Sequence, residues 1–181
     1  MNKTIKWTFV SVCIFAALAL IIVSARVVRA QTSQPIVLSN VAQEVLNLTN
    51  VERQKAGCAP LIPNAQLLRA AQNHSNDMAY MDYVGHVSSY GATLADRLRA
   101  AWYIYSVAGE NVAAGQTTPE EVVQAWMKSP GHRENILDCG FTEIGIGYKH
   151  LHSEWGEANY YHYWTQNFGR PRVLGWLTSS N

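Results

Sequence analysis

The spacing of apolar residues changes near residue 132, and this change limits the possible folds more than any other feature of the chain. Upstream, apolar side chains recur every three or four positions, as they do on one face of a helix. The helical patterns cover residues 38–55, 64–81, 93–102 and 118–128. Downstream, residues 144–148 and 161–166 alternate between two sets of side chains, which is typical of strands.

The order of these patterns predicts the fold class. A polar loop of about residues 149–159 joins the two late strands without a crossover helix, so we expect them to pair in antiparallel fashion. Residues 103–112 are expected to form a third strand region. Helices first and strands late, in a chain with a single core, predict an α+β sandwich.

Each helical pattern begins with residue types that cap helices. These are Ser39 or Asn40, then Asn64, Thr93 and Thr118. The apolar stripe of the second helix, which we expect to be buried, contains Leu67, Ala71, His74, Met78 and Met81. We expect His74 to be a core histidine with a hydrogen-bonding neighbour rather than a ligand.

The first 30 residues have the features of an export signal. Lys3 and Lys6 precede a mainly apolar run over residues 7–23, and Val28-Arg29-Ala30 offers a small-residue cleavage site. Residues 31–37 then form a short lead. An uncleaved N-terminal anchor is the alternative interpretation. In either case we expect the remaining chain to lie outside the cytoplasm, as a secreted protein or as an anchored one that faces outside.

Cleavage after Ala30 would leave residues 31–181, a length that suits one domain. The whole sequence has 14 basic and 13 acidic residues, and four of the basic ones precede residue 30, so the mature chain has 10 basic residues and a net charge of about −3. A nucleic-acid partner is not expected, because phosphate binding requires clustered Lys and Arg.

Of the three cysteines, Cys13 lies in the export signal. The remaining pair, Cys58 and Cys139, is predicted to form a disulfide in an oxidising compartment. The alternative is a reactive thiol. It is disfavoured because neither cysteine lies in a CxxC motif or beside a helix-start signature.

Three acid-base side chains lie at the boundaries of predicted elements. His86 follows Gly85, Glu110 lies in the segment AGEN, and His132 follows Pro130-Gly131, which is expected to end the fourth helix. Two imidazoles and a carboxylate suit either a divalent-metal centre of the His2Glu type, with zinc as an example, or a metal-free acid-base pair. The separations of 24 and 22 residues do not fix their geometry and no HExxH helix is present, so both interpretations stay open.

Other hydrolase signatures are missing from the sequence. There is no GxSxG elbow and no phosphate-binding glycine loop. His150 and His152 could share one face of an extended strand, with His162 across the hairpin. We interpret all three as residues of a flexible, solvent-facing loop.

Five segments occur in an order that points to a known family. They are HSNDMA, VGHVSSYGATLADRL, AGENVAAGQTTPEEVVQAWMKSPGHRENIL, FTEIGIGY and YWTQNFG. The chain resembles the CAP superfamily, also called the SCP domain, in the form common among exported bacterial proteins. The resemblance covers about residues 38–169, followed by a C-terminal tail of residues 170–181, and ordered motifs of this length are more specific than any single one.

This resemblance implies a three-layer α-β-α sandwich with a small, mainly antiparallel sheet. It also implies a central cleft lined by two histidines and acidic residues, which hold a divalent cation in some members. Carried over by motif, the cleft residues are His86, Glu110 and His132. Arg133 and Asn135 would then be scaffold residues that orient His132.

Two features depart from the family pattern. Many eukaryotic members have a second glutamate three residues after the tryptophan of the fourth helix, where this chain has Ser129 after Trp126. Val84-Gly85 also stands in place of the usual aromatic residue before the first histidine. The acid set is therefore incomplete unless Glu121 or Glu134 substitutes, and a bound metal would be held weakly.

Three functions stay open for an exported protein of this kind. The first is a monomeric binding module whose cleft recognises a cell-envelope component, a lipid or a peptide, with assistance from a divalent cation. The second is a hydrolase, such as a peptidase, that depends on a metal or on a His-Glu pair. The third is a non-catalytic defence or interaction scaffold, since fold does not decide function. We favour the binding module because no nucleophile is evident and the acid set lacks one member.

Overall fold

The computed structural model describes residues 36–152 and 158–172. The predicted export signal or anchor, residues 1–30, lies outside the described residues, as do residues 31–35 of the short lead and the tail from residue 173. Within the described ranges, no helix is both long and apolar enough to cross a membrane.

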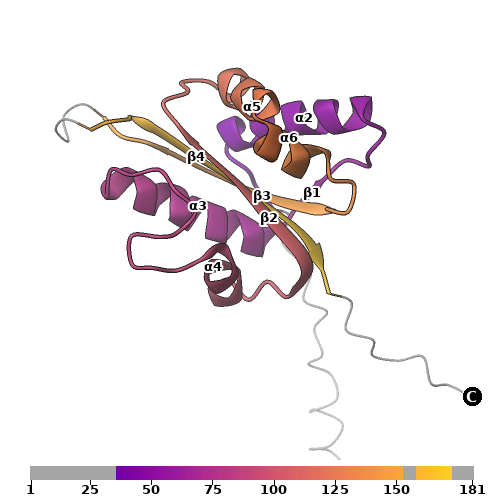
Figure 1. Ribbon diagram of the computed structural model, residues 1–181, viewed down its shortest axis with the longest axis horizontal. Coiled ribbons are helices and arrows are strands. Elements are labelled where there is room, and N and C mark those ends of the chain that lie inside the picture. The colour runs from indigo at the N-terminus through magenta and orange to yellow at the C-terminus, as the bar shows by residue number, and fades with distance from the viewer. Residues whose placement is uncertain (1–35, 153–157, 173–181) are drawn as a thin grey trace, which may run out of the picture. The chain divides into compact units, whose positions relative to one another are not determined.

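The described residues form five helices and four strands in three layers. In chain order these are α2 (Asn40–Lys55), β1 (Ile62–Pro63), α3 (Ala65–Tyr80), α4 (Leu94–Ala100), β2 (Tyr105–Ala114), α5 (Pro119–Lys128), α6 (Pro130–Leu137), β3 (Glu143–His150) and β4 (His162–Pro171). The sheet lies between α3 and α4 on one side and α2, α5 and α6 on the other (Figure 1). The predicted three-layer α+β sandwich is therefore confirmed.

The sheet has the strand order β1-β3-β4-β2. β3 pairs with β4 in antiparallel fashion, as predicted for the late hairpin. β2, in the predicted third strand region, also pairs with β4 in antiparallel fashion. The two-residue strand β1 was not predicted, and it runs parallel to β3. In this order β2 is an edge strand, so side chains can approach it around the edge as well as from both faces.

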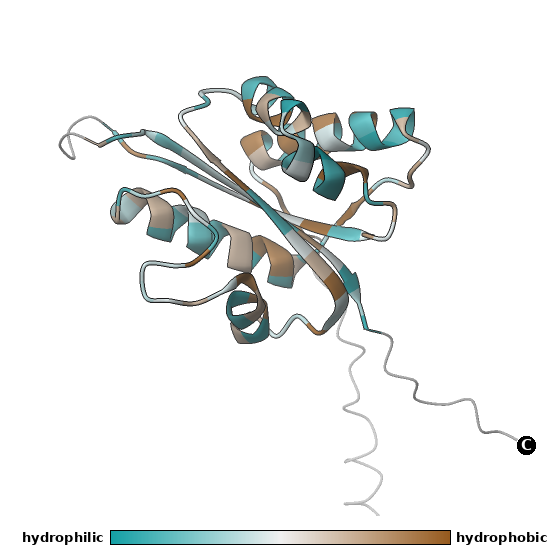
Figure 2. Cartoon of the chain, viewed as in Figure 1, coloured by the Kyte–Doolittle hydropathy of each residue, from teal (hydrophilic) through white to brown (hydrophobic). Residues whose placement is uncertain are grey.

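Helices cover both faces of the central strand β4, so its residues 163–169 are all buried. On one face, Trp164 and Phe168 pack in a core with Trp126 of α5. Figure 2 shows hydrophobic and hydrophilic stretches along the strands, while hydrophilic residues cover much of the outer helices. The prediction that Met81 is buried was wrong: α3 ends at Tyr80, and Met81 beyond it is 60% exposed.

Residues 129–137 contain a helix that the sequence pattern did not predict. The fourth helix does end before Pro130-Gly131, since α5 stops at Lys128, but a new helix, α6, begins immediately at Pro130. Proline suits the first position of a helix because the N–H that it lacks would have no partner there. His132 therefore lies in the first turn of α6 rather than in an irregular turn.

The predicted disulfide between Cys58 and Cys139 is present, with Cα atoms 5.0 Å apart. It joins the segment after α2 to the segment after α6. The same two segments are also joined by Arg53, which is fully buried. Its guanidinium donates to the carbonyl oxygens of Ala59, Ile136, Asp138 and Phe141 at 2.8–3.0 Å. A covalent bond and a buried cation thus hold α6 near α2.

Two glycines of β3 allow α3 to pack directly against the sheet. A Cβ atom at Gly145 would collide with the backbone of Leu67 and Leu68, and one at Gly147 would collide with the backbone of Ala71. Because backbone atoms cannot rotate away as a flexible side chain can, an added methyl group must push the helix outward.

We expect Gly145→Ala to lower the free energy of unfolding by about 1–3 kcal/mol, the usual cost of overpacking a well-packed core. Urea denaturation of the mature protein measures this change. Gly131→Ala is the matched control, because a Cβ there meets nothing within 4 Å. Equal stability of the two variants would show that α3 and β3 are not in close backbone contact.

Candidate functional site

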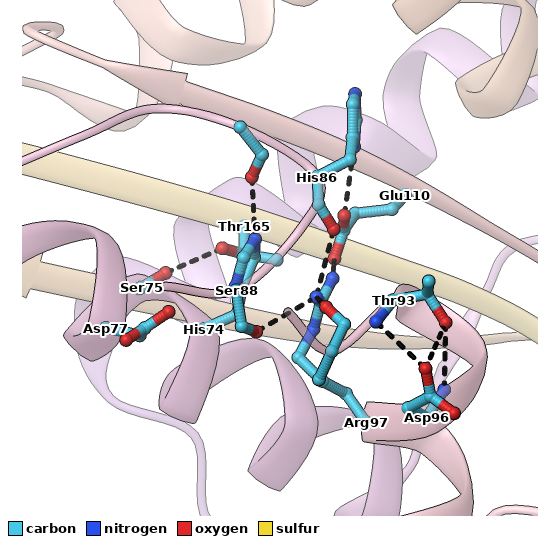
Figure 3. Close-up of polar contacts among 12 residues, drawn as sticks. His74, Ser75, Asp77, His86, Ser88, Thr93, Asp96, Arg97, Glu110 and Thr165 are labelled. Carbon is cyan, nitrogen blue, oxygen red and sulfur yellow. Dashed lines mark hydrogen bonds and ion pairs between the residues drawn. The ribbon is translucent and has the colours of Figure 1, made fainter. Parts of the chain in front are cut away.

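The three predicted cleft residues come from different elements, and the structure joins two of them directly. His86 lies in the loop between α3 and α4, Glu110 lies in β2, and His132 lies in α6. His86 Nδ1 is 2.9 Å from Glu110 Oε1 (Figure 3). The Glu110 side chain is 2% exposed, whereas that of His86 is 58% exposed. A buried carboxylate therefore holds an imidazole that faces solvent.

The other oxygen of Glu110 is bound by Arg97, a residue that the sequence analysis did not identify. Arg97 Nη2 is 2.6 Å from Glu110 Oε2, and both side chains are buried. Arg97 Nη1 donates to Ser88 Oγ and to the carbonyl oxygens of His86 and Ala92. One guanidinium thus fixes both the carboxylate and the loop that carries His86.

The sequence does contain a pattern from which a buried Arg97 could have been predicted. Arg97 lies in α4 on the same face as Leu94, Leu98 and Ala101, which pack into a hydrophobic cluster. A cation on an apolar helix face is buried and needs an opposite charge nearby. The sequence alone did not show that the opposite charge is Glu110, 13 residues away in another element.

Asn167 gives Glu110 a further partner across the sheet. The two residues are directly opposite each other on β4 and β2. With its amide oriented so that donors meet acceptors, Asn167 donates to Glu110 Oε2 at 2.9 Å, and its oxygen accepts from the Ala71 amide at 3.1 Å. All the polar contacts of the carboxylate thus come from residues held by helix, loop and sheet.

On the other side of β2, a network of amide side chains positions α6. Asn111 Nδ2 donates to the His132 carbonyl oxygen at 3.0 Å and to Gln166 Oε1 at 3.2 Å. Asn135 Nδ2 donates to the Glu110 carbonyl oxygen at 3.1 Å and to Asn111 Oδ1 at 2.9 Å. The contacts of Asn135 agree with its predicted scaffold role. Arg133 is exposed and does not take part in this network.

The two cleft histidines are thus held from opposite faces of an edge strand. Glu110 and Asn111 are neighbours in β2, so their side chains point to opposite faces of the sheet. Glu110 holds His86 through its ring, and Asn111 holds His132 through its backbone. The two histidines are near enough for the charge of His86 to lower the pKa of His132.

The two imidazoles have opposite protonation tendencies. The hydrogen bond that His86 donates to Glu110 raises the pKa of His86 above its ordinary value. Burial, and then the charge of His86, lowers the pKa of His132. His86 therefore keeps its proton at pH values where His132 has already lost its own.

His74 has the core position that the sequence predicted. It is fully buried, and its Nε2 donates to the Gly85 carbonyl oxygen at 2.8 Å. Burial is the main reason why its pKa is lowered. Because Gly85 precedes His86, this neutral histidine helps to hold the loop of the site in place.

The divalent-metal centre of the His2Glu type stays a prediction. Within residues 36–152 and 158–172, no group of three or more His, Cys, Asp or Glu residues is arranged to hold a metal ion. Among the three predicted cleft residues, Glu110 bonds His86 with one oxygen and the buried Arg97 with the other. Glu110 is therefore an orienting partner of His86.

The two possible substitutes for the missing glutamate, Glu121 and Glu134, have other surroundings. The Glu121 carboxylate accepts hydrogen bonds from the backbone and hydroxyl of Thr117, at the start of α5. Glu134 lines a surface groove on α6 together with Met127 and Leu137.

Three histidines that were interpreted as loop residues have a different environment. His150 ends β3 and His162 begins β4, so these two belong to strands and are half-buried rather than free in a loop. With His152 they line a cavity of about 610 Å³ that contains none of the cleft residues.

Comparison with known proteins identifies the family. The family model described as the cysteine-rich secretory protein family, CAP, matches residues 46–168. The chain therefore belongs to this family, as the ordered motifs indicated.

Two relatives come from Bacillus subtilis (strain 168). The uncharacterized protein YkwD is 46% identical over 125 residues, which cover 68% of this chain and 48% of that protein. The uncharacterized membrane protein YlbC is 34% identical over 126 residues, which cover 70% of this chain and 33% of that protein. The chain thus spans about half the length of the first relative and a third of the second.

Solved structures show the same fold. An extracellular protein containing a SCP domain from Bacillus anthracis str. Ames superimposes with a TM-score of 0.62 and 31% identity, over 76% of this chain and 45% of that one. An outer surface protein from Borrelia burgdorferi has a TM-score of 0.62 and 18% identity, over 72% of this chain and 92% of that one. The second likeness supports the fold alone.

Proposed function

We propose that this chain is an exported CAP-family binding module, in which His86 and His132 receive an anionic group of a cell-envelope ligand. The phosphate of a lipid and the carboxylate of a peptide both have the required charge. The observation that carries the proposal is the buried Glu110 carboxylate, which bonds both Arg97 and the exposed ring of His86.

The charges of these three groups favour an anion. Arg97 and Glu110 are buried and neutralise each other, so a proton on His86 adds one positive charge at the surface. Imidazolium groups donate strong hydrogen bonds to carboxylate and phosphate. His132, with its lowered pKa, supplies a second ring that can donate or accept according to the ligand.

A divalent cation such as zinc fits this site through two protein donors only, the ring nitrogens of His86 and His132. Glu110 would orient His86, as carboxylates outside the coordination sphere do in metal sites. A bound cation would add positive charge for the same anionic ligand. With two protein donors instead of the usual three or four, we expect weak binding.

Three features support export. The N-terminal residues have the pattern of a signal or anchor, the disulfide requires an oxidising compartment, and the B. anthracis structure is described as extracellular. We propose a secreted monomer, or a form anchored with the domain facing outside. The acidic mature chain gives no reason to expect a nucleic-acid partner.

A hydrolase is the second candidate, and one observation favours it. The pKa values of His86 and His132 are shifted in opposite directions, which is the arrangement that separates a general acid from a general base. In that case neutral His132 would remove a proton from water, and protonated His86 would donate one to the leaving group.

Titration of the mature protein with defined probes distinguishes these candidates. The probes are vesicles with and without anionic phospholipid, and peptidoglycan fragments with free or amidated carboxylates. We expect binding to the charged form of one probe, with at least a tenfold loss in His132→Gln and none in the exposed control Tyr90→Phe. Binding that is equal in His132→Gln and the wild type would refute the cleft proposal, and turnover of a probe that His132→Gln abolishes would establish the hydrolase.

A further inference from the structure

Three histidines gather at the end of the β3–β4 hairpin, away from the residues of the cleft. His150 and His162 are directly opposite each other in the strand register. Their rings stack at a centroid distance of 4.4 Å and an angle of 19°. The ring of His152 lies edge-on to that of His150 at 4.8 Å. Half of the six histidines in the chain are thus within contact distance of one another.

One of these rings has a fixed orientation. His162 Nδ1 is 2.7 Å from the hydroxyl of Tyr148, so its Nε2 is left for another partner. Tyr148 packs against Trp164 at 4.2 Å, and Trp164 donates from Nε1 to the Gln116 carbonyl oxygen. Metal-bound histidines typically have this arrangement, in which one nitrogen is held by a protein group and the other faces the ligand.

The rings border open space. With Thr117, Asn159 and Tyr160, the three histidines line the cavity of about 610 Å³. A cation and its water molecules can therefore reach the ring nitrogens from solvent. His152 is exposed and can rotate freely, whereas His150 and His162 are held by the strands.

We propose that His150, His152 and His162 form a second site, which binds a divalent transition-metal ion that prefers imidazole, such as Zn²⁺ or Ni²⁺. Directly opposed residues of an antiparallel pair have Cβ atoms about 4.5–5.5 Å apart, a spacing from which two imidazoles can reach one ion. His152, two residues after His150, lies on the same side of an extended chain and supplies the third nitrogen.

Binding requires the rings of His150 and His152 to turn toward His162. His150 and His162 are stacked in the structure, and no group of three donors in the described ranges already surrounds one point. Rotation of the side chains at the cavity would exchange the stacking contact for nitrogen-metal bonds of about 2.0–2.1 Å. Three histidine ligands would leave a further coordination position open to water from the cavity.

Calorimetric titration of the mature, oxidised protein with ZnCl₂ and NiCl₂ at pH 7.5 tests this site. We expect one ion to bind to the His86→Gln/His132→Gln double variant, because that variant keeps the hairpin histidines. His152→Gln, a change at an exposed position, is expected to weaken this binding at least tenfold, and His162→Gln is expected to do the same. Circular dichroism and thermal melting confirm that each variant is folded.

The outcomes distinguish metal binding at the hairpin histidines from metal binding at His86 and His132. Metal binding that survives in His152→Gln and His162→Gln but is lost in the cleft double variant would overturn the hairpin site and support a cleft cation instead. Absence of binding of either ion to the wild type would overturn it as well. As a second measurement, ¹H-¹⁵N spectra of the imidazoles should shift at His150, His152 and His162 when zinc is added.

Discussion

Replacing Arg97 with methionine is expected to lower the free energy of unfolding by about 3–5 kcal/mol, the usual cost of removing one partner from a buried ion pair. The Glu110 carboxylate, 2% exposed, would lose its opposite charge, and the loop that carries His86 would lose its contacts with the guanidinium. Urea denaturation of the mature, oxidised protein measures the change.

Arg99 provides the matched control in the same helix. Its side chain is 77% exposed and pairs with Asp96 at 2.9 Å. Exposed pairs contribute about 0–1 kcal/mol, so Arg99→Met should have little effect. The double variant Arg97→Met/Glu110→Gln should be more stable than Arg97→Met alone, because the unpaired charge is gone. If Arg97→Met costs no more than Arg99→Met, Glu110 is not held by a buried ion pair.

Loss of the disulfide between Cys58 and Cys139 is expected to lower the free energy of unfolding by about 4 kcal/mol. The two cysteines are 81 residues apart, so the bond strongly restricts the unfolded chain in the chain-entropy account of disulfide stability. Unfolding curves of the oxidised protein and of the variant Cys58→Ala/Cys139→Ala give the difference.

The contacts of Arg53 should preserve the native fold of this cysteine-free variant. Because the Arg53 guanidinium still binds carbonyl oxygens on both sides of the missing bond, the native fold should persist at low temperature, with an unchanged circular dichroism spectrum. Oxidised and cysteine-free proteins of equal stability would contradict the expected effect on the unfolded chain.

Local patterns predicted most of the secondary structure. Ser39, Asn64, Thr93 and Thr118 each accept a hydrogen bond from the first turn of the helix that they precede. Such caps depend on neighbours in sequence, so they can be recognised without a structure. The disulfide could be predicted because only two cysteines were left to pair.

Contacts between distant segments could not be predicted in the same way. The pairing of Arg97 with Glu110 depends on how α4 packs against the sheet, which no local pattern records. The helix α6 was missed because Pro130-Gly131 was interpreted only as the end of α5. The sequence analysis considered His162 across the hairpin from His150 and His152 but interpreted all three as loop residues, because their stacking depends on the register of β3 and β4. The family motifs brought His86 and Glu110 together, but they did not show that Arg97 and Asn167 also bond the carboxylate.

The account depends most on the claim that buried Glu110 holds a proton on His86. Titration of the His86 ring by NMR, in the wild type and in folded Glu110→Gln, tests it most directly. We predict a pKa above the ordinary value of 6.5 in the wild type and a lower pKa in the variant. The His86–Glu110 contact then stabilises the fold fully below the unfolded pKa of His86 and is lost as the pH rises through the raised one. A wild-type pKa at or below 6.5, or the same pKa in both proteins, would contradict the claim.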